Sequence, residues 1–323
     1  MKKEYVSTFI EGLEEPVEAA LRKTGGVSVN RIYPGLAMYK SVRDPDLPFV
    51  HRTYLLLSQM RPQKDLDSGL RQLSATDSWL DRFDFESIQG KQFRIITAEN
   101  GTPVACNMRY VQMLEKNISE QTGMVSNRLR PEVELWVNLR PEGLYFLWRL
   151  GKHNVAKSAD PLRRDLCEII AFLAAPKGEN ATILGLTGPN LPEALASQGA
   201  GNISAVYASQ IKEKKENIRV PRLHLLPGSP GYTGIEPGSQ QAALLCIAPK
   251  GSFSVQEDAM RGVVREAASI LKPNGTLVTF YPTDKGRVLR RTEEFDCLTR
   301  YEIVISGERC YLEVFRKTSK PLE

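Results

Sequence analysis

Residues 181–196, ATILGLTGPNLPEALA, restrict the C-terminal half of this chain to a small group of folds. Residues 181–186 form an apolar run typical of a buried strand, a glycine-containing turn follows, and a helix is predicted to begin near Asn190. An open α/β sheet uses strand, glycine turn and helix in this order to present a nucleotide-like ligand at the carboxyl end of its first strand. Backbone N–H groups at the start of the helix attract polar groups of such a ligand.

The turn itself is a reduced version of that unit. It has two glycines, Gly185 and Gly188, rather than three, and no acidic residue, and Pro189 removes one backbone donor. Asn190 and Glu193 have the spacing of a capping box, which predicts a helix that caps its own first turn. The turn therefore allows two interpretations, a structural turn and a ligand-binding turn, and the pattern favours the structural one.

Strands and helices alternate through the rest of this half. Strands are predicted at 203–208, 242–247 and 276–281, helices near Glu193, up to Ile218 and at 257–271, and a terminal hairpin from strands at 299–306 and 309–316. This alternation predicts an α/β domain with a mostly parallel, doubly wound sheet. The hairpin adds an antiparallel edge to that sheet.

The first 150 residues have a different organisation. A strand at 5–10, a helix at 14–23 and strands at 27–32 and 36–39 predict a small α+β unit, which a breaker cluster at 44–48 ends. A second series is predicted after it: a strand at 51–57, short helices at 66–73 and 78–83, a strand at 93–98, a helix at 109–122, and hairpin strands at 133–139 and 144–150.

Three segments of this second series, FRIITAENG, NMRYVQMLEKNISEQTG and LRPEVELWVNLRPEGLYFLWRL, resemble the THUMP domain, the RNA-binding module of several tRNA and rRNA modification enzymes. The resemblance covers about residues 51–150, and the first 50 residues look like the small ferredoxin-like domain that precedes THUMP in that family. In the family this pair grips tRNA near its 3′ acceptor end. The resemblance implies a ferredoxin-like domain at 1–50, a THUMP domain at 51–152, and a linker with a catalytic-type domain at 153–323.

Cationic residues of this region are the candidate RNA contacts, because phosphate contacts dominate nucleic-acid affinity. The candidates are Arg94, Arg109, Lys116, Arg128, Arg130 and Lys152. Glutamates such as Glu115, Glu120 and Glu134 interleave with them, and a solvated mixed surface would have the same composition. The formal net charge of +5 allows an RNA partner without requiring one. Trp136 and Trp148 lie within apolar strand patterns, which predicts core or interface positions rather than base stacking.

In the C-terminal half, LKPNGTLVTFYP resembles a segment of the class I S-adenosylmethionine-dependent methyltransferases, and the predicted element order is similar to their Rossmann-like fold. In THUMP methyltransferases the methionine part of the cofactor rests against an Asp-Pro-Phe-Cys-Gly-Ser-Gly-like loop after the first strand. Here Gly185 stands at the position of the acid, and Gly188 is the nearest loop glycine. After the second strand the family places an acid on the cofactor ribose. Gln210 stands at that position, and Lys212 replaces a second acid.

The third motif bears on the chemistry. Amino-group methyltransferases of this type carry Asn/Asp-Pro-Pro-Tyr/Phe after the fourth strand, where the polar side chain positions the target nitrogen. The corresponding residues are Ala248, Pro249, Lys250 and Gly251, which lack the polar acceptor and the aromatic ring. A lysine in this pocket repels a cationic cofactor if its charge points inward. No residue is therefore assigned a catalytic role, and Gly185, Gly188 and Gln210 are the positional equivalents of cofactor-binding residues.

These features predict a tRNA-binding THUMP protein whose methyltransferase domain is catalytically impaired. Two alternatives stay open: an active S-adenosylmethionine-dependent tRNA guanine-N2 methyltransferase with atypical motifs, and a non-catalytic partner subunit of an RNA-modifying enzyme. A protein partner or a homo-oligomer is compatible with each.

The remaining composition excludes other classes. The five cysteines are scattered without a CxxC pair, which predicts neither a metal site nor a disulfide framework. No apolar run has the length of a membrane helix, and the first residues lack the apolar stretch of a signal peptide, which predicts a cytoplasmic protein.

Overall fold

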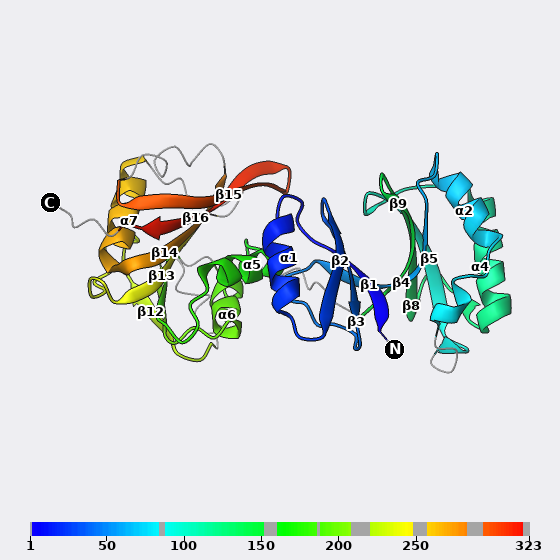
Figure 1. Cartoon of the computed structure of the whole chain (residues 1–323), viewed down its shortest axis with the longest axis horizontal. Helices are drawn as coiled ribbons and strands as arrows, with labels where there is room; N and C mark the ends of the chain where they lie inside the picture. The colour runs from blue at the N-terminus through cyan, green and yellow to red at the C-terminus, as the bar shows by residue number, and fades with distance from the viewer. Residues whose placement is uncertain are drawn as a thin grey trace. The chain divides into compact units, whose positions relative to one another are not determined.

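The computed structural model describes residues 2–83, 88–151, 160–185, 188–207, 220–247, 257–282 and 293–318. Within these residues the chain is a mixed α/β protein with two β-sheets (Figure 1). It divides into two compact units. The first unit comprises Met1–Thr8 and Leu21–Asn154, and the second comprises Phe9–Ala20 and Val155–Glu323. The boundary between Ala20 of the second unit and Leu21 of the first falls inside helix α1 (Glu14–Lys23).

The first unit is built on one sheet, for which nine strands are described, in the order β2-β3-β1-β4-β9-β8-β5-β6 with β7 beside β5. The strands are β1 (Lys3–Thr8), β2 (Val27–Tyr33), β3 (Leu36–Ser41), β4 (Arg52–Met60), β5 (Gln92–Glu99), β6 (Thr102–Pro103), β7 (Val125–Ser126), β8 (Val133–Arg140) and β9 (Gly143–Arg149). Its helical elements are α2 (Leu66–Ser74), the short 3₁₀ helix η1 (Leu80–Arg82) and α4 (Met108–Thr122).

The two faces of this sheet differ in what covers them. Helices α2 and α4 pack against each other and against β5 and β8 on one face (Figure 1). Aromatic contacts on this face join Trp79 to Phe146 and Phe83 to Trp148. The side chains on the other face of β8 include Glu134 and Trp136, because residues two apart in a strand share a face. Trp136 is 4% exposed and lies in a core that also contains apolar residues of β1, β3, β4 and β9, as expected for a core position.

The second unit contains the sheet predicted for the C-terminal half. Its strands are β10 (Ala181–Leu184), β11 (Ile203–Tyr207), β12 (Leu223–Pro227), β13 (Gln240–Cys246), β14 (Leu271–Pro282), β15 (Phe295–Ile305) and β16 (Glu308–Lys317), and its helices include α5 (Arg164–Ala174), α6 (Asn190–Ser197) and α7 (Glu257–Ile270). The strand order is β12-β11-β10-β13-β14-β16-β15. The pairs from β12 to β14 are parallel, and β16 runs antiparallel to β14 and β15. The predicted parallel sheet with an antiparallel terminal hairpin is therefore confirmed.

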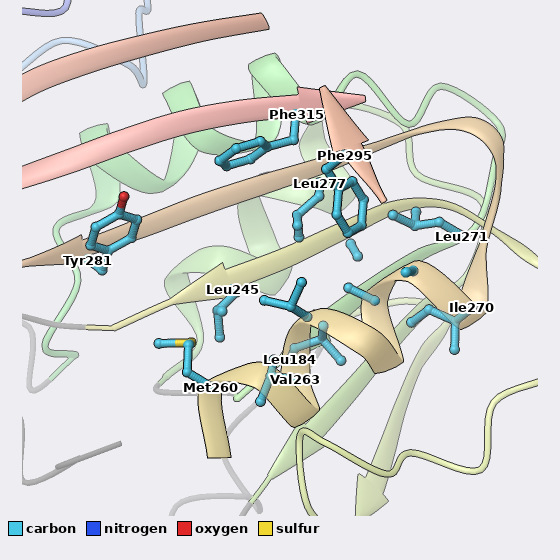
Figure 2. Packing of buried hydrophobic residues seen from close by; sticks show 14 of the residues in the cluster. Leu184, Leu245, Met260, Val263, Ile270, Leu271, Leu277, Tyr281, Phe295 and Phe315 are labelled. Carbon is cyan, nitrogen blue, oxygen red and sulfur yellow. The ribbon is translucent and has the colours of Figure 1, made fainter. Parts of the chain in front are cut away.

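Helices cover both faces of this sheet. Leu245 of β13 and Leu277 of β14 point toward Val263 of α7, and all three belong to one apolar core (Figure 2). Cys246 points to the opposite face, on the side of Cys167 of α5. Burial raises the pKa of the Cys246 thiol to about 12. Burial on both faces is what a parallel sheet requires and explains the continuous apolar run of β13.

Several boundaries differ from the predictions. Strand β10 ends at Leu184, two residues before the predicted end, because Gly185 has φ +93° and leaves the strand conformation. Strand β14 begins at Leu271 rather than Thr276, so the predicted turn at 273–275 lies inside a strand. Strand β12 was not predicted, and the helix predicted up to Ile218 lies outside the described residues. The predicted helix at 78–83 is the short η1.

A helix long and apolar enough to cross a membrane is absent from the described part of the chain.

Candidate functional site

The candidate ligand crevice lies at the carboxyl edge of the second unit's sheet. Strand β10 is the first strand of this sheet in the chain, and the chain passes from it to β11 on one side and later to β13 on the other. Such a reversal of strand order opens a crevice at the carboxyl ends of the two central strands. The described part of the turn after β10 lies at this edge, whereas residues 208–219 after β11 and 248–256 after β13 lie outside the described residues. Of the predicted site residues, Gly185 and Gly188 are described, while Gln210, Ala248, Pro249 and Lys250 lie outside the described residues.

Gly185 directly follows β10 and faces a turn from the loop after β12. A Cβ built on Gly185 would lie 4.0 Å from Cγ of Pro230. The same turn is tied to the end of β11, because the Gly228 N–H donates to the carbonyl of Tyr207 at 3.3 Å. The segment after β12 therefore lies beside the turn that follows β10, on the side of β11.

Gly188 packs against an acidic side chain. A Cβ built on Gly188 would lie 2.4 Å from Cγ of Asp160, so a larger residue here would require Asp160 to move. One oxygen of that carboxylate accepts a hydrogen bond from the Asn190 N–H at 2.8 Å, and the other accepts from the Leu162 N–H at 2.9 Å. Asp160 thus occupies the start of α6, where free N–H groups and the helix dipole attract negative charge.

The predicted capping box is wrong. Helix α6 begins at Asn190 with Pro189 in the cap position, and no side-chain cap comes from that position. The Asn190 side chain instead donates to the carbonyl of Leu162 at 2.7 Å. Asp160, 30 residues earlier in the chain, supplies the acceptor for the helix start. No local pattern around Asn190 indicates this partner, because it comes from the segment that precedes α5.

The glycine- and proline-rich segment after β12 runs along α7. Gly231 approaches the backbone of Gly262, since a Cβ on Gly231 would lie 3.3 Å from its carbonyl carbon. The Thr233 N–H donates to the Glu266 carboxylate at 2.8 Å, and the Gly238 N–H donates to the Ser269 carbonyl at 2.9 Å. These contacts join the segment to α7.

Asp160 decides how well this site suits S-adenosylmethionine. The resemblance to THUMP methyltransferases implies that the methionine part of the cofactor rests against the turn after β10. That part carries a carboxylate, and the start of α6 would be its natural partner. Here a carboxylate of the protein already accepts the Asn190 N–H. Two carboxylates repel each other at such a site, so a pose that places the cofactor carboxylate at the start of α6 requires Asp160 to move, whereas the ammonium group of the same methionine part would be attracted to Asp160.

The predicted RNA contacts fall on two different faces of the first unit. Arg109, Lys116, Arg128 and Arg130 are exposed on α4 and the segment after it. Lys116 lies 3.7 Å from the Glu120 carboxylate, and Arg128 lies 3.3 Å from that of Glu115. Arg94 lies on the sheet face opposite α4, and Lys152 lies outside the described residues. The structure therefore brings four of the six candidates to one side of the unit.

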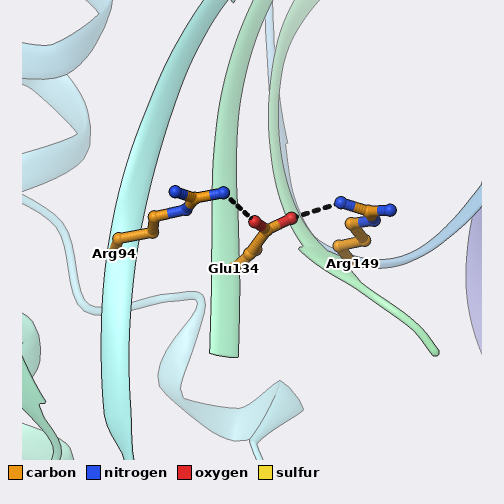
Figure 3. Close-up of polar contacts among 3 residues, drawn as sticks. All are labelled: Arg94, Glu134 and Arg149. Atoms are coloured by element: carbon orange, nitrogen blue, oxygen red, sulfur yellow. Dashed lines mark hydrogen bonds and ion pairs between the residues drawn. The ribbon is translucent and has the colours of Figure 1, made fainter. Parts of the chain in front are cut away.

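Arg94 belongs to a group that sequence reasoning missed. It donates to one oxygen of Glu134, and Arg149 donates to the other at 2.6 Å (Figure 3). Burial raises the pKa of Glu134, but the hydrogen bonds and charges of Arg149 and Arg94 outweigh burial and hold that pKa below its usual value. The guanidinium of Arg52 lies 5.1 Å from the centre of the Trp136 ring on the same face. The alternation of side chains along β8 indicates which face Glu134 points to. Its arginine partners could not be inferred in the same way, because they depend on the register of the neighbouring strands.

The strand order and terminal hairpin define the second unit as a class I methyltransferase fold, preceded here by a separate α/β unit. No protein-family model and no curated protein matches the sequence. Solved structures match over the whole chain. TrmN from Thermus thermophilus has a TM-score of 0.75 at 15% identity, covering 97% of this chain and 99% of its own. A possible methylase from Clostridium difficile 630 has a TM-score of 0.70 at 12% identity, with 100% of each chain covered. SMU.472, solved in complex with SAH, has a TM-score of 0.68 at 11% identity, with 100% of this chain and 99% of its own covered.

Proposed function

We propose that this protein binds tRNA through its first unit and that its second unit, a methyltransferase fold, does not transfer methyl groups. The Asp160 carboxylate at the start of α6 is the observation that carries the second part, because it stands where the cofactor's own carboxylate would bind. The substitutions at three motif positions support it: Gln210 replaces an acid by an amide, Ala248 lacks the polar side chain that the resemblance assigns to the substrate, and Lys250 adds a cation.

The first part is supported by the whole-chain likeness to structures such as TrmN and by the resemblance of residues 51–152 to THUMP. Residues 1–50 and 153–323 are proposed as the ferredoxin-like part and the methyltransferase-like part with its linker. The exposed cations on α4 and the segment after it supply charge for phosphates. Their neighbouring glutamates reduce the net charge of that surface, so binding would depend on several weak contacts rather than one strong patch.

A second candidate is an active tRNA guanine-N2 methyltransferase with an unusual pocket. SMU.472 favours it, because a structure solved with SAH shares this fold over its whole length. In that case Asp160 would have to leave Asn190 when the cofactor enters. A non-catalytic partner subunit of an RNA-modifying enzyme is the third candidate, and it predicts co-purification with a stoichiometric enzyme.

The RNA-binding part is tested by the affinity of the full chain for tRNA as a function of salt, measured by fluorescence anisotropy. We expect the affinity to fall by roughly 10³-fold between about 50 and about 200 mM salt if about six phosphates are contacted. Arg109→Ala and Arg130→Ala should each lower the slope of log affinity against log salt by about one.

Lys272→Ala is the matched control, because it removes one positive charge from the second unit, where Lys272 pairs with Glu179 at 2.7 Å. It should leave the slope unchanged. Undetectable tRNA binding at low salt, or an equal change of slope in the control, would contradict the proposal.

A further inference from the structure

Buried hydrogen-bond donors without an acceptor lie on the face of the first unit's sheet opposite helices α2 and α4. They are Arg52 Nε, Arg94 Nε, Trp136 Nε1 and the Tyr145 hydroxyl. In the part of the chain that the structure describes, only one further buried side-chain atom lacks a partner, Thr279 Oγ1 in the second unit. Buried polar groups of folded proteins are nearly always bonded, so a concentration of exceptions on one face calls for an explanation.

Strand register places these four residues on one face. Arg94 lies opposite Glu134, and Tyr145 lies opposite Asn138, in the strands on either side of β8. Glu134, Trp136 and Asn138 are two residues apart in β8 and so point to the same side. Arg52 joins this side because its guanidinium lies over the Trp136 ring. Helices α2 and α4 cover the other face.

The charge at one end of this face is positive. Two guanidinium groups, those of Arg94 and Arg149, share one carboxylate, that of Glu134, and a third, that of Arg52, lies over the ring of Trp136 in the same strand. We call these three arginines the arginine cluster. The Arg94 side chain is 37% exposed and the Arg149 side chain 21%, so a ligand in solvent can reach both. Glu134 satisfies only part of the hydrogen-bonding capacity of Arg94, because a guanidinium carries five N–H donors and Arg94 Nε has no acceptor.

The unsatisfied donors of the arginine cluster, Arg52 Nε and Arg94 Nε, specify the chemistry of a partner. Both are N–H groups that can donate, and the surrounding net charge is positive. A suitable ligand is therefore anionic and rich in acceptor oxygens. Phosphate groups meet both conditions, and the planar guanidinium of arginine matches their geometry with two parallel bonds.

We propose that the arginine cluster binds a phosphodiester group of RNA, with Glu134 holding the guanidinium groups in place and competing with the phosphate for them. This inference rests on the proposed RNA-binding function and assigns it a site on the face opposite α4. The competition has a consequence that a structural ion pair lacks: removal of the Glu134 charge increases affinity. Trp136, beside the cluster, reports on occupancy.

The test combines indole N–H spectroscopy with tRNA affinity, on the full chain. The three tryptophans give three indole signals in a ¹H–¹⁵N spectrum. Titration with the ribonucleotide trimer UpUpU should shift the Trp136 signal. The Trp79 signal is the internal control, because its Nε1–H donates to the Thr76 carbonyl at 2.7 Å on the other face of the sheet. Arg94→Ala should abolish the shift and weaken tRNA binding.

Glu134→Gln keeps the shape of the side chain and removes its charge, so it tests the proposal even if Arg94→Ala does not fold. We expect it to bind tRNA several-fold more tightly than the unaltered protein. Glu120→Gln is the matched control, since the Glu120 side chain is 61% exposed on α4 and its loss changes the net charge equally. A gain in affinity that is larger for Glu134→Gln supports the site at the arginine cluster.

Three results would overturn the proposal: a Trp136 signal that UpUpU does not move, equal affinities of the two glutamine variants, or a Trp136 response to polyglutamate but not to UpUpU, which would indicate an acidic protein surface instead. The outcomes also separate this inference from the proposed function. A Trp136 response to UpUpU without any tRNA binding supports the site and removes the tRNA function. Tight tRNA binding that neither variant changes removes the site and leaves the function.

Discussion

Replacing Glu313 by alanine should lower the free energy of unfolding of the second unit by about 2–4 kcal/mol, through a lost buried acceptor and a cavity. Glu313 lies in β16 and is 0% exposed. Its carboxylate accepts hydrogen bonds from the Tyr281 hydroxyl and from the Arg300 guanidinium. Alanine removes this acceptor from both partners. Tyr281 is 1% exposed, so solvent does not reach its side chain in compensation.

Urea unfolding followed by circular dichroism measures this loss. The three tryptophans all lie in the first unit, so their fluorescence reports on that unit separately. Glu302→Ala is the matched control on the same hairpin, because that carboxylate is 54% exposed and 3.8 Å from Arg309. Its effect should stay within about 0.5 kcal/mol, as for most surface ion pairs. Equal losses in the two variants would show that the buried acceptor contributes no more to stability than the exposed carboxylate of Glu302.

Gly12→Ala should destabilise the second unit by about 2–4 kcal/mol, because it combines backbone strain with a clash. Gly12 has φ +92°, a conformation that residues with a Cβ rarely adopt, and a Cβ built there would lie 2.3 Å from the carbonyl oxygen of Glu302. That oxygen belongs to the backbone of β15, so it cannot move away as a flexible side chain would. The close approach packs the segment before α1 against the edge strand of the sheet.

Gly307→Ala separates the two causes. Gly307 has φ +83° in the turn between β15 and β16, and nothing lies within 4 Å of a Cβ built on it. Its replacement should cost only the strain of a left-handed residue, about 1 kcal/mol. Calorimetric unfolding of both variants gives the difference due to the clash. A Gly12 variant no less stable than the Gly307 variant would mean that the approach to Glu302 is not tight.

The second unit was largely predictable because its elements have strong local patterns. The apolar runs of β10 and β13 and the amphipathic pattern of α7 each indicate one type of element. Strand β12, Leu223–Pro227, was missed because it is only partly buried and ends in a proline. Residues 273–275 look like a turn, yet β14 continues through them, with a register shift between Gln240 and Ala242 in the neighbouring strand.

The pairing of the first unit's strands was less accessible. Its sheet joins β1 to β4 and β4 to β9, strands that lie far apart in the chain. Local periodicity specifies which face of a strand is apolar but not which strand lies beside it. For this reason the arginine cluster could not be found from sequence. Arg52, Arg94 and Arg149 come from three strands, and only the register brings Arg94 and Arg149 to Glu134 and Arg52 to Trp136.

The candidate crevice shows the same limit. Gly185 and Gly188 are correctly placed after β10 by the spacing of the turn. A side chain at Gly188 would require the Asp160 carboxylate to move, and no local pattern indicates this contact. Asp160 also favours the structural interpretation of the turn, because a helix start that already binds a carboxylate attracts an acidic ligand less strongly. The structural interpretation of the turn and the proposed lack of methyl transfer thus depend on the same contact.

Calorimetric titration of the full chain with S-adenosylhomocysteine, followed by tRNA, tests this account most directly. S-adenosylhomocysteine carries the same amino-acid carboxylate as the cofactor but no sulfonium charge. Repulsion between Lys250 and a sulfonium therefore does not contribute to the result. We expect no binding heat from S-adenosylhomocysteine in the micromolar range and a clear heat from tRNA at low salt. Micromolar binding of S-adenosylhomocysteine would contradict the account, because it would mean that the ligand displaces Asp160 from Asn190 and that the crevice is a working cofactor site.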